Sequence, residues 1–480
     1  MGTTSLLIRN GIVVSASDRC RADVLIDGEV IAAVGRIDSS ADRVIDAEGC
    51  YVIPGGIDTH THLENPSLGV TRSADDFRSG TVAAAHGGTT TIIDFVKKES
   101  GATLLDSFLR RRERAETAIG VDLGLHPVVP ATALADGSFD DLESLAIDHG
   151  ATSWKFFMAY PGLLMVDDET LIHGFRRCAD LGVLPMVHAE NGHLVGDATQ
   201  RLLAGGHSAE HYHHDAHSHL AEGEAVHRAV AIAASVGAPL FIVHVSSRFA
   251  AREIGRARAD GHVVCGEACP QYLLAALEDY CDKGFEAAAY VCSPPIRERA
   301  NQEYLWDAIR AGDLATVGTD HAAFTMCQPD DLPPQKPYGR GQFTKIPNGV
   351  PGIEERLRVM YEAGVVGGRF DICRFVDLVA TRPAKLFGLH PRKGALLPGA
   401  DADVVVWDPT ARHTIYAADL HHRADYSLYE GMEVSAGPRW VIGRGTVLVG
   451  PDGAHIAPGR GRYLHRGRST LSDELDRRSG

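Results

Sequence analysis

The chain has 480 residues, enough for two to four domains or for one large barrel with an attached module. Hydrophobic residues make up 44% of it and charged residues 23%, as in an ordinary globular protein. The net charge of −16 argues against a nucleic-acid partner. The sequence has no apolar run of about 18 residues, which argues against a membrane-spanning helix.

The nine cysteines are odd in number and lie scattered from Cys20 to Cys373. The first residues lack the basic start and long apolar core of a signal peptide. These two features predict a cytoplasmic chain with reduced thiols. Cys265 and Cys269 have no second Cys or His pair arranged as in a zinc finger, so we interpret them as small buried side chains.

The first 55 residues alternate in hydrophobicity and are rich in β-branched side chains, which predicts strands over 5–14 and 23–35. Asp27 and Gly28 predict a hairpin turn, since type I′ turns need positive φ. A similar β-rich pattern returns at residues 399–407, 440–442 and 446–449. Neither half forms a plausible domain alone. Together they predict a small β-sandwich that the chain enters, leaves and re-enters.

Between these halves, apolar strands alternate with amphipathic helices. Strands are predicted over residues 57–62, 89–96, 121–129, 152–160, 184–190, 239–247, 262–269 and 314–320. Clear helical patterns cover residues 76–86, 168–181, 222–236 and 248–259. Eight strand–helix units predict a (β/α)8 TIM-type barrel within the α/β class. The alternative, an open doubly wound sheet, would more often carry a glycine-rich phosphate loop, and the sequence has none.

The resulting domain prediction has four parts. They are the first sandwich part at 1–55, the barrel at 56–390, the second sandwich part at 391–458 and a tail at 459–480.

The first predicted barrel strand ends in the sequence PGGIDTHTH, with His60 and His62 two residues apart. Residues i and i+2 of a strand project from the same face, so both imidazoles can bind one metal ion. By itself, a His-x-His pair is weak evidence for a metal site, because two unrelated surface or core histidines are the more common explanation.

Four further strand ends carry polar side chains that can bind metal, namely Lys155, His188, His244 and Asp320. Each has another explanation when taken alone. A core histidine can be satisfied by hydrogen bonds, the lysine can extend to the barrel mouth, and the aspartate can cap a helix. Because the carboxyl ends of barrel strands meet on one face, the five strand ends together predict a metal centre.

The motifs extend well beyond these residues, and the chain resembles the dihydropyrimidinases and hydantoinases, the cyclic-amide hydrolase branch of the amidohydrolases. The match runs nearly end to end, to about Leu464. It is carried by GGIDTHTH at 55–62, KFFMAY at 155–160, HAENG at 188–192, HVSS at 244–247, PQYL at 270–273, SPPIR at 293–297, GTDH at 318–321 and IPNGVPGIEER at 346–356.

This resemblance implies two zinc ions per subunit, bridged by Lys155 in the form of N6-carboxylysine. A buried lysine beside two dications loses its ammonium form through desolvation and repulsion, and the neutral amine can then add carbon dioxide. The implied ligands form two sets: His60, His62 and Asp320 for one ion, and His188 and His244 for the other.

The resemblance also implies the reaction, which opens the ring amide of 5,6-dihydropyrimidines or 5-substituted hydantoins to give N-carbamoyl amino acids, as in pyrimidine catabolism. Asp320 would take a proton from the attacking water and pass it to the leaving nitrogen. Tyr160 would donate a hydrogen bond to the developing oxyanion. Backbone groups near Ser293 and Asn348 would recognise the cyclic imide. Without the resemblance, a packed tyrosine and ordinary turns explain these residues.

Other functions of the same fold stay open. Dihydroorotases usually carry an arginine just after the His-x-His pair, where this chain has Glu64, a residue that would repel a substrate carboxylate. Allantoinase is disfavoured for a similar reason. A non-catalytic scaffold, like the collapsin-response proteins, would lack metal ligands that are present here. The loop at 63–70 leaves the choice of ring substituent open.

Two segments have no assigned role at this point. Residues 207–219 contain six histidines and form either an additional metal site or an irregular polar connection. The charged tail at 459–480 is, by the resemblance, a segment that helps subunits assemble into a homo-oligomer, a dimer or a tetramer. The alternative is a disordered end.

Overall fold

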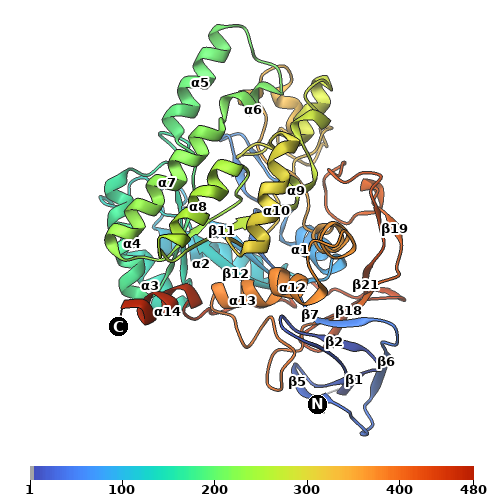
Figure 1. Ribbon diagram of the computed structural model, residues 1–480. Coiled ribbons are helices and arrows are strands. Elements are labelled where there is room, and N and C mark those ends of the chain that lie inside the picture. The colour runs from blue at the N-terminus through green and yellow to red at the C-terminus, as the bar shows by residue number, and fades with distance from the viewer. Residues whose placement is uncertain (1–4, 480) are drawn as a thin grey trace.

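A computed structural model describes residues 5–479 of the chain. A larger part contains parallel strands and most of the helices, and a smaller part, built from both ends of the chain, contains two mixed sheets whose strand pairs are mostly antiparallel (Figure 1). The predicted mixed α/β class is therefore confirmed.

Eight strands of the larger part run parallel in chain order, and each lies inside a predicted strand range except β8, which starts one residue earlier, at Gly56. They form a three-stranded and a five-stranded sheet. Isolated parallel bridges from Val128 to Lys155 and from Thr61 to His321 connect the edges of the two sheets. The strands are β8 (Gly56–Thr61), β11 (Thr89–Val96), β12 (Asp122–Pro127), β13 (Ser153–Phe157), β14 (Leu184–His188), β15 (Leu240–Ile242), β16 (Val264–Ala268) and β17 (Leu314–Val317).

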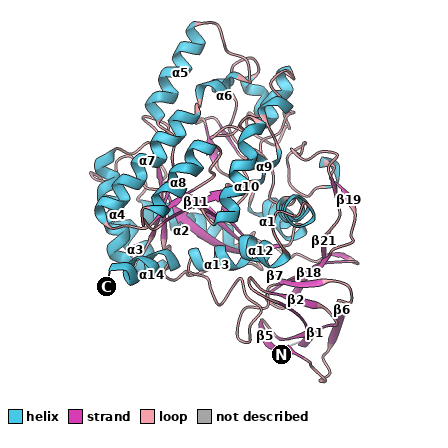
Figure 2. Ribbon diagram, in the orientation of Figure 1, coloured by secondary structure: helices cyan, strands magenta, loops and turns pink. Residues whose placement is uncertain are grey.

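The helices that follow these strands surround them (Figure 2). Asp76, Asp167 and Ser247 each cap the helix that follows by accepting a hydrogen bond from its first turn. The predicted helices over 168–181 and 248–259 are confirmed residue for residue. The main helices are α1 (Phe77–His86), α2 (Leu104–Glu116), α3 (Ser138–His149), α4 (Asp168–Leu181), α7 (His219–Val236), α8 (Arg248–Ala259) and α10 (Gln302–Ala311).

The other helical segments lie in the connections and near the C-terminus. They are α5 (Gly192–Ala204), α6 (Tyr212–Ala216), α9 (Pro270–Leu274), α11 (Arg356–Met360), α12 (Ile372–Val376), α13 (Arg382–Leu386), α14 (Thr470–Ser479), the π-helical turns η6 (Tyr361–Val366) and η7 (Asp377–Thr381), and the 3₁₀ turns η1 (Leu277–Asp279), η2 (Gly284–Tyr290), η3 (Arg299–Asn301), η4 (Lys336–Gly339), η5 (Phe343–Lys345) and η8 (Ala417–Asp419).

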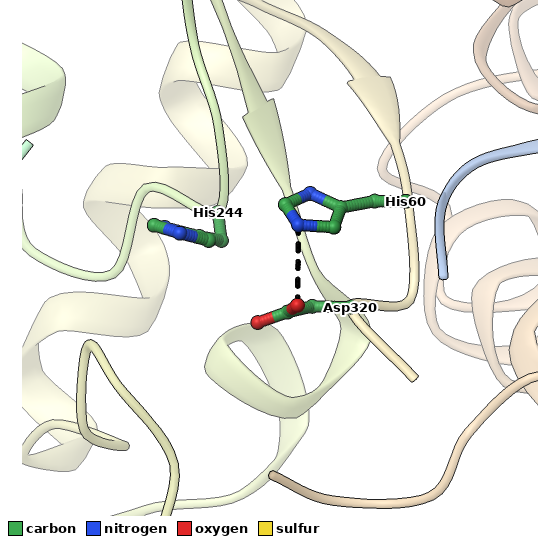
Figure 3. Close-up of side chains that lie close together, drawn as sticks. All are labelled: His60, His244 and Asp320. Atoms are coloured by element: carbon green, nitrogen blue, oxygen red, sulfur yellow. Dashed lines mark ion pairs between the residues drawn. The ribbon is translucent and has the colours of Figure 1, made fainter. Parts of the chain in front are cut away.

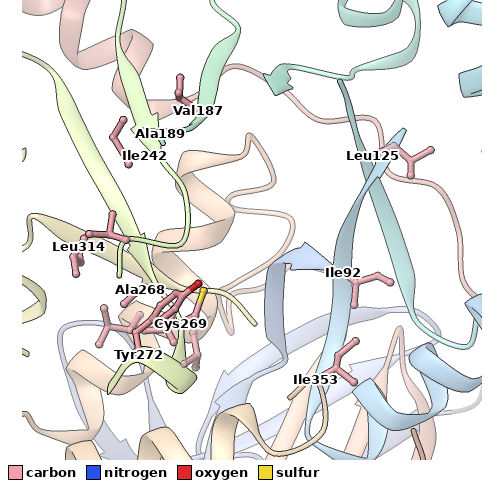
Figure 4. Packing of buried hydrophobic residues seen from close by; sticks show 14 of the residues in the cluster. Ile92, Leu125, Val187, Ala189, Ile242, Ala268, Cys269, Tyr272, Leu314 and Ile353 are labelled. Carbon is pink, nitrogen blue, oxygen red and sulfur yellow. The ribbon is translucent and has the colours of Figure 1, made fainter. Parts of the chain in front are cut away.

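Alternate residues of the parallel strands belong to two separate hydrophobic clusters. Ile92, Val187 and Ile242 lie in the large cluster that includes helix residues (Figure 4). Their neighbours Ile93 and Met186 lie in a second cluster, which Leu386 of α13 and Leu471 of α14 also join. Since successive strand side chains point to opposite faces, one face of these strands packs on the helices and the other packs inward.

The smaller part combines both ends of the chain. β7 pairs with β18 across the two ends, and β4 and β5 form the predicted hairpin, with Gly28 at φ 58° in its turn. The four-stranded sheet contains β1 (Ser5–Arg9), β4 (Asp23–Asp27), β5 (Val30–Gly35) and β6 (Arg43–Asp46). The seven-stranded sheet contains β2 (Ile12–Val14), β3 (Arg19–Arg21), β7 (Tyr51–Pro54), β18 (Val404–Asp408), β21 (Gly437–Gly443), β22 (Thr446–Gly450) and β23 (Gly453–Ala454). Two small ribbons pair β9 (Pro66–Ser67) with β10 (Thr71–Arg72) and β19 (His413–Thr414) with β20 (Glu433–Val434).

A buried ionic network links the two parts. Lys393 Nζ lies 2.6 Å from Asp122 Oδ2 and 2.7 Å from Asp403 Oδ2, and Asp122 also pairs with Arg444. Asp122 begins β12, whereas Asp403 and Arg444 flank strands of the seven-stranded sheet. The tail also packs on its own chain, because Leu464 and Leu471 are buried in the inward cluster. An irregular, disordered tail is therefore wrong for the described residues to 479.

All nine cysteines lie within residues 5–479 and are free, and Cys265 and Cys269 are buried as predicted. Within the same residues, none of the helices combines the length and the apolar character needed to cross a bilayer.

Candidate metal centre

A single cavity at the carboxyl ends of the parallel strands is lined by all nine residues that the sequence singled out. They are His60, His62, Lys155, Tyr160, His188, His244, Ser293, Asp320 and Asn348. Their convergence follows from the strand order, since parallel strands present their carboxyl ends on one face. The remaining lining residues come mainly from the loops after β8 and β13.

Asp320 lies between the two histidines of the first strand. Its Oδ1 atom is 3.2 Å from His60 Nε2 and 3.0 Å from His62 Nε2. Donor atoms of His60, His244 and Asp320 all lie within 4.8 Å of one another. Figure 3 shows His60 and Asp320 joined by their ion pair, with His244 beside them.

His188 and His244 form a second pair of facing donors. His188 Nδ1 lies 2.9 Å from His244 Nε2, and the two ring planes meet at 75°. This arrangement brings two ring nitrogens from neighbouring strands to one point.

Two buried carboxylates orient these imidazoles from behind. Glu267 Oε1 lies 2.7 Å from His60 Nδ1, and Glu190 Oε2 lies 2.9 Å from His188 Nε2. Each carboxylate accepts the ring N–H, so the lone pair is on the opposite nitrogen, the one that faces the cavity. Such carboxylate–histidine pairs are typical behind metal ligands.

Sequence reasoning missed the role of Glu267. The signal available was a carboxylate inside the apolar strand β16, which is buried completely. A Cβ atom at Gly318 would lie 2.4 Å from Glu267 Oε2, so the absence of a side chain at that position makes room for this carboxylate.

Lys155 is 1% exposed, and its Nζ atom lies 5.1 Å from the ring centres of Phe95 and Phe157. Burial lowers the pKa of its amine to about 7, against the opposing effect of Asp320. A substantial share of neutral amine at neutral pH is what carbamate formation requires.

The imidazoles and the carboxylate are in the protonation states that metal binding needs. Burial lowers the pKa of His60, His188 and His244, which keeps these rings neutral. Burial alone would raise the pKa of Asp320, but His60 and His62 outweigh it and hold the carboxyl ionised.

Three of the nine predicted site residues, none of them glycine, have positive φ. The values are 66° at Tyr160, 39° at His244 and 53° at Asp320. Such left-handed backbone is uncommon and gathers at functional sites. It also explains why β15 and β17 end earlier than predicted, at Ile242 and Val317.

The opposite wall of the cavity carries the predicted substrate groups. Asn348 Nδ2 donates to Ser293 Oγ over 2.9 Å. Burial, together with Glu190, raises the pKa of Tyr160, against hydrogen bonding from Ser293 and Asn348. The phenol therefore keeps its proton and can donate it in a hydrogen bond.

Part of the histidine-rich segment supports this centre rather than standing apart from it. His217 Nδ1 lies 2.8 Å from Glu190 Oε1, and His213 Nε2 lies 3.3 Å from Ser293 Oγ. His217, Glu190 and His188 thus form one buried chain of contacts that ends at the cavity.

The residues fit a metal pair. The donor set is four imidazoles, one carboxylate and one lysine, all nitrogen and oxygen donors of the kind that zinc accepts. His60 Nε2 is buried and has no hydrogen-bond partner among residues 5–479, although it faces Asp320. A cation between these two atoms would satisfy both.

The expectation about Glu64 is wrong. Its side chain forms an ion pair of 2.8 Å with Arg114. Among the described residues, the cavity is lined by the next residue, Asn65, and not by Glu64. Repulsion by Glu64 therefore gives no argument against an anionic substrate. Lys97, at the end of β11, lines the cavity instead.

Fold and site together define a hydrolase of the amidohydrolase class, and residues 51–447 match the amidohydrolase family. The chain is 44% identical to the D-hydantoinase of Geobacillus stearothermophilus over 464 residues, which is 96% of each protein. It is 39% identical to the dihydropyrimidinase of Rattus norvegicus over 469 residues, 96% of this chain and 88% of the relative.

A solved structure agrees with these relatives. The crystal structure of dihydropyrimidinase from Brevibacillus agri NCHU1002 superposes with a TM-score of 0.93 at 43% identity, covering 97% of this chain and 99% of the other. The chain belongs to the amidohydrolase family, in its hydantoinase and dihydropyrimidinase group. The predicted resemblance is confirmed.

Proposed function

We propose that the chain is a binuclear zinc hydrolase that opens the ring amide of 5,6-dihydropyrimidines or 5-substituted hydantoins to N-carbamoyl amino acids. The observation that carries this proposal is the convergence of six metal-competent side chains from five strands in one cavity. The hydantoinases and dihydropyrimidinases that match almost the whole chain support the choice of substrate class.

The fold proposal is a closed (β/α)8 barrel over 56–390 with a β-sandwich formed by 1–55 and 391–458. The parallel bridges that connect the edges of the two parallel sheets support closure. The hydrophobic cluster shared by strands from the four-stranded and the seven-stranded sheet supports the sandwich.

We assign one ion to His60, His62 and Asp320 and the other to His188 and His244, with N6-carboxylated Lys155 between them. When bound, the metal ions supply Lewis acidity, which lowers the pKa of a water molecule and polarises the ring carbonyl. The low pKa of buried Lys155 supports carboxylation, because only the neutral amine attacks carbon dioxide.

The protein's own side chains perform the proton transfers. Asp320, held ionised by His60 and His62, accepts the proton of the attacking water and returns it to the leaving ring nitrogen. Tyr160, which keeps its proton, donates a hydrogen bond to the oxyanion that forms at the carbonyl.

The substrate ring binds between the histidines and the segments that carry Ser293 and Asn348. A cyclic imide alternates C=O and N–H groups, which match backbone donors and acceptors in these turns. Phe157, Leu163 and Leu164 line the same cavity and offer an apolar wall for a ring substituent.

Dihydroorotase and allantoinase activities, and a scaffold without catalysis, are the alternatives. The complete set of candidate ligands argues against the non-catalytic scaffold.

A side-by-side assay of 5,6-dihydrouracil, 5-substituted hydantoins, dihydroorotate and allantoin tests which ring the enzyme opens, with zinc content measured on the same preparation. We expect turnover of the first two classes only. A preparation that binds no zinc and opens none of the rings would refute the proposal.

We further propose that the chain acts in the cytoplasm as a homo-oligomer, a dimer or a tetramer, on a small-molecule substrate and without a nucleic-acid or membrane partner. The tail packs on its own subunit through Leu464 and Leu471, which positions the polar side of α14 outward. Sedimentation velocity on the full chain, and on a chain ending before α14, tests the contribution of this helix to assembly.

A further inference from the structure

A second group of metal-competent side chains lies outside the substrate cavity. His214 in α6, His219 at the start of α7 and Glu298 each offer one donor atom, and these atoms lie within 4.8 Å of one another. None of the three residues lines the substrate cavity. They account for two of the six histidines in the histidine-rich segment.

The spacing of the donors suits a tetrahedral metal ion. His219 Nε2 lies 2.9 Å from Glu298 Oε2, and His214 Nε2 lies 3.8 Å from Glu298 Oε1. Ligand bonds of about 2.0–2.2 Å place tetrahedral donors roughly 3.3 Å apart, between these two distances. The imidazole planes meet at 81° with ring centres 6.2 Å apart, so the two rings approach one point from different directions.

His214 has a defined tautomer that leaves a lone pair facing this point. Its Nδ1 atom lies 3.1 Å from Asp215 Oδ1, so Nδ1 carries the proton and donates it to the carboxylate. The Nε2 lone pair then faces Glu298. His214 is only 8% exposed, and its Nε2 atom has no hydrogen-bond partner within residues 5–479. A buried lone pair that faces a carboxylate needs a cation between them.

The surrounding charges permit such a cation. Arg297, which precedes Glu298 in the chain, brings a positive charge close to His219. The positive charge of Arg297 is itself balanced by Glu222, 3.1 Å away.

A comparable group elsewhere lacks the required geometry. His86 and His421 lie beside Glu354, but their rings are stacked 3.4 Å apart at 14°. Stacked rings direct their lone pairs side by side, so these two cannot converge on one ion.

We propose that His214, His219 and Glu298 form a third divalent-metal site, selective for ions of the zinc type, with solvent as the fourth ligand. The site connects the junction of α6 and α7 to the segment that follows Ser293. It is structural, because the ion closes a link between the segment that contacts Glu190 and the segment that carries Ser293.

The position of the site explains what it would stabilise. His217, between two of the ligands, contacts Glu190, which in turn orients His188. Arg297, next to Glu298, donates to the backbone carbonyl of His217. A metal ion would therefore stabilise the contacts through which His217 and Glu190 orient His188. The proposal does not depend on which ring the enzyme opens.

Metal counting on the full chain tests this proposal. We expect His214→Ala and Glu298→Gln to bind one equivalent of Zn²⁺ fewer than the unaltered chain, measured by elemental analysis after loading with Zn²⁺ and gel filtration. His207→Ala is the matched control, since His207 is exposed in the same segment and outside the cluster, and it should retain full stoichiometry.

Lys155→Ala separates this site from the catalytic pair. The variant should bind one equivalent of Co²⁺ more than Lys155→Ala combined with His214→Ala, with the visible absorption of a tetrahedral site in the difference spectrum. It should also gain more thermal stability from Zn²⁺ than the double variant. If His214→Ala does not fold, Glu298→Gln alone serves the same comparison. Equal zinc content in the unaltered chain, His214→Ala and Glu298→Gln would overturn the proposal.

Discussion

The Nδ1 atom of His60 lies 2.7 Å from the Oε1 atom of Glu267, and both side chains are completely buried. The carboxylate also accepts a hydrogen bond from Thr59 Oγ1, so its position is constrained from two sides. Glu267 therefore determines which nitrogen of His60 faces the cavity.

Glu267→Gln should weaken metal binding by about 10–100-fold, because an amide can present either an oxygen or an NH₂ group to His60 and no longer fixes its tautomer. Competition with a zinc chelator at constant pH measures the change. Glu303→Gln, at a surface ion pair with Arg369, is the control and should leave zinc affinity unchanged. Equal affinity of Glu267→Gln and the unaltered chain would remove Glu267 from the metal centre.

Lys155→Ala should abolish ring opening and remove at least one ion of the catalytic pair, because the bridging anion is lost. Intact-mass analysis under non-acidic conditions should detect one added carbon dioxide on the unaltered chain and none on this variant. Lys97→Ala is a useful comparison, since Lys97 lines the same cavity outside the ligand set and should leave zinc content intact. Near-normal turnover of Lys155→Ala would refute the assignment.

Tyr160→Phe should lower kcat by roughly 10²–10³-fold, the usual cost of one oxyanion donor. The effect should fall on kcat rather than on zinc content, because the phenol is not a ligand. Stopped substrate assays together with zinc analysis distinguish these two effects. A variant that keeps full kcat would exclude Tyr160 from the chemistry.

Most of the candidate site was predictable because its polar side chains lie in or just after apolar strands. His188 is the last residue of β14, and Lys155 lies inside β13, where a charged side chain is conspicuous. Helix boundaries followed from periodicity and caps, as at α4, where Asp167 accepts from the backbone of Thr170.

What escaped prediction depends on contacts between distant parts of the chain. Glu267 and His60 are 207 residues apart, and no local pattern pairs them. Positive φ at His244 shortens β15, and a histidine gives no sequence signal for that conformation. Glu64 pairs with Arg114 of α2 instead of facing the cavity, since its direction is set by tertiary structure.

The buried network around Lys393 should contribute strongly to stability. Lys393→Met leaves Asp122 and Asp403 with one cation fewer, and the free energy of unfolding should fall by about 3–5 kcal/mol, as when one partner of a buried ion pair is removed. Chemical denaturation monitored by circular dichroism measures this change. Arg201→Ala, at an exposed pair with Asp197, should cost less than about 1 kcal/mol.

The same network predicts how stability depends on pH. Burial alone would raise the pKa of Asp122, but Lys393 and Arg444 outweigh it and hold the pKa below the ordinary value. A carboxyl with a depressed folded-state pKa stabilises the protein above its unfolded pKa of about 3.9, and this contribution is lost as the pH falls through the folded-state value.

Burial alone would lower the pKa of Lys393, but Asp403, Asp122 and Asp401 raise it above the ordinary value. Its contribution is therefore complete below about pH 10.4 and is lost above that. Between these limits the difference in unfolding free energy between Lys393→Met and the unaltered chain should be constant, and it should shrink on either side. A difference that changes steadily between pH 5 and pH 9 would contradict this account of the network.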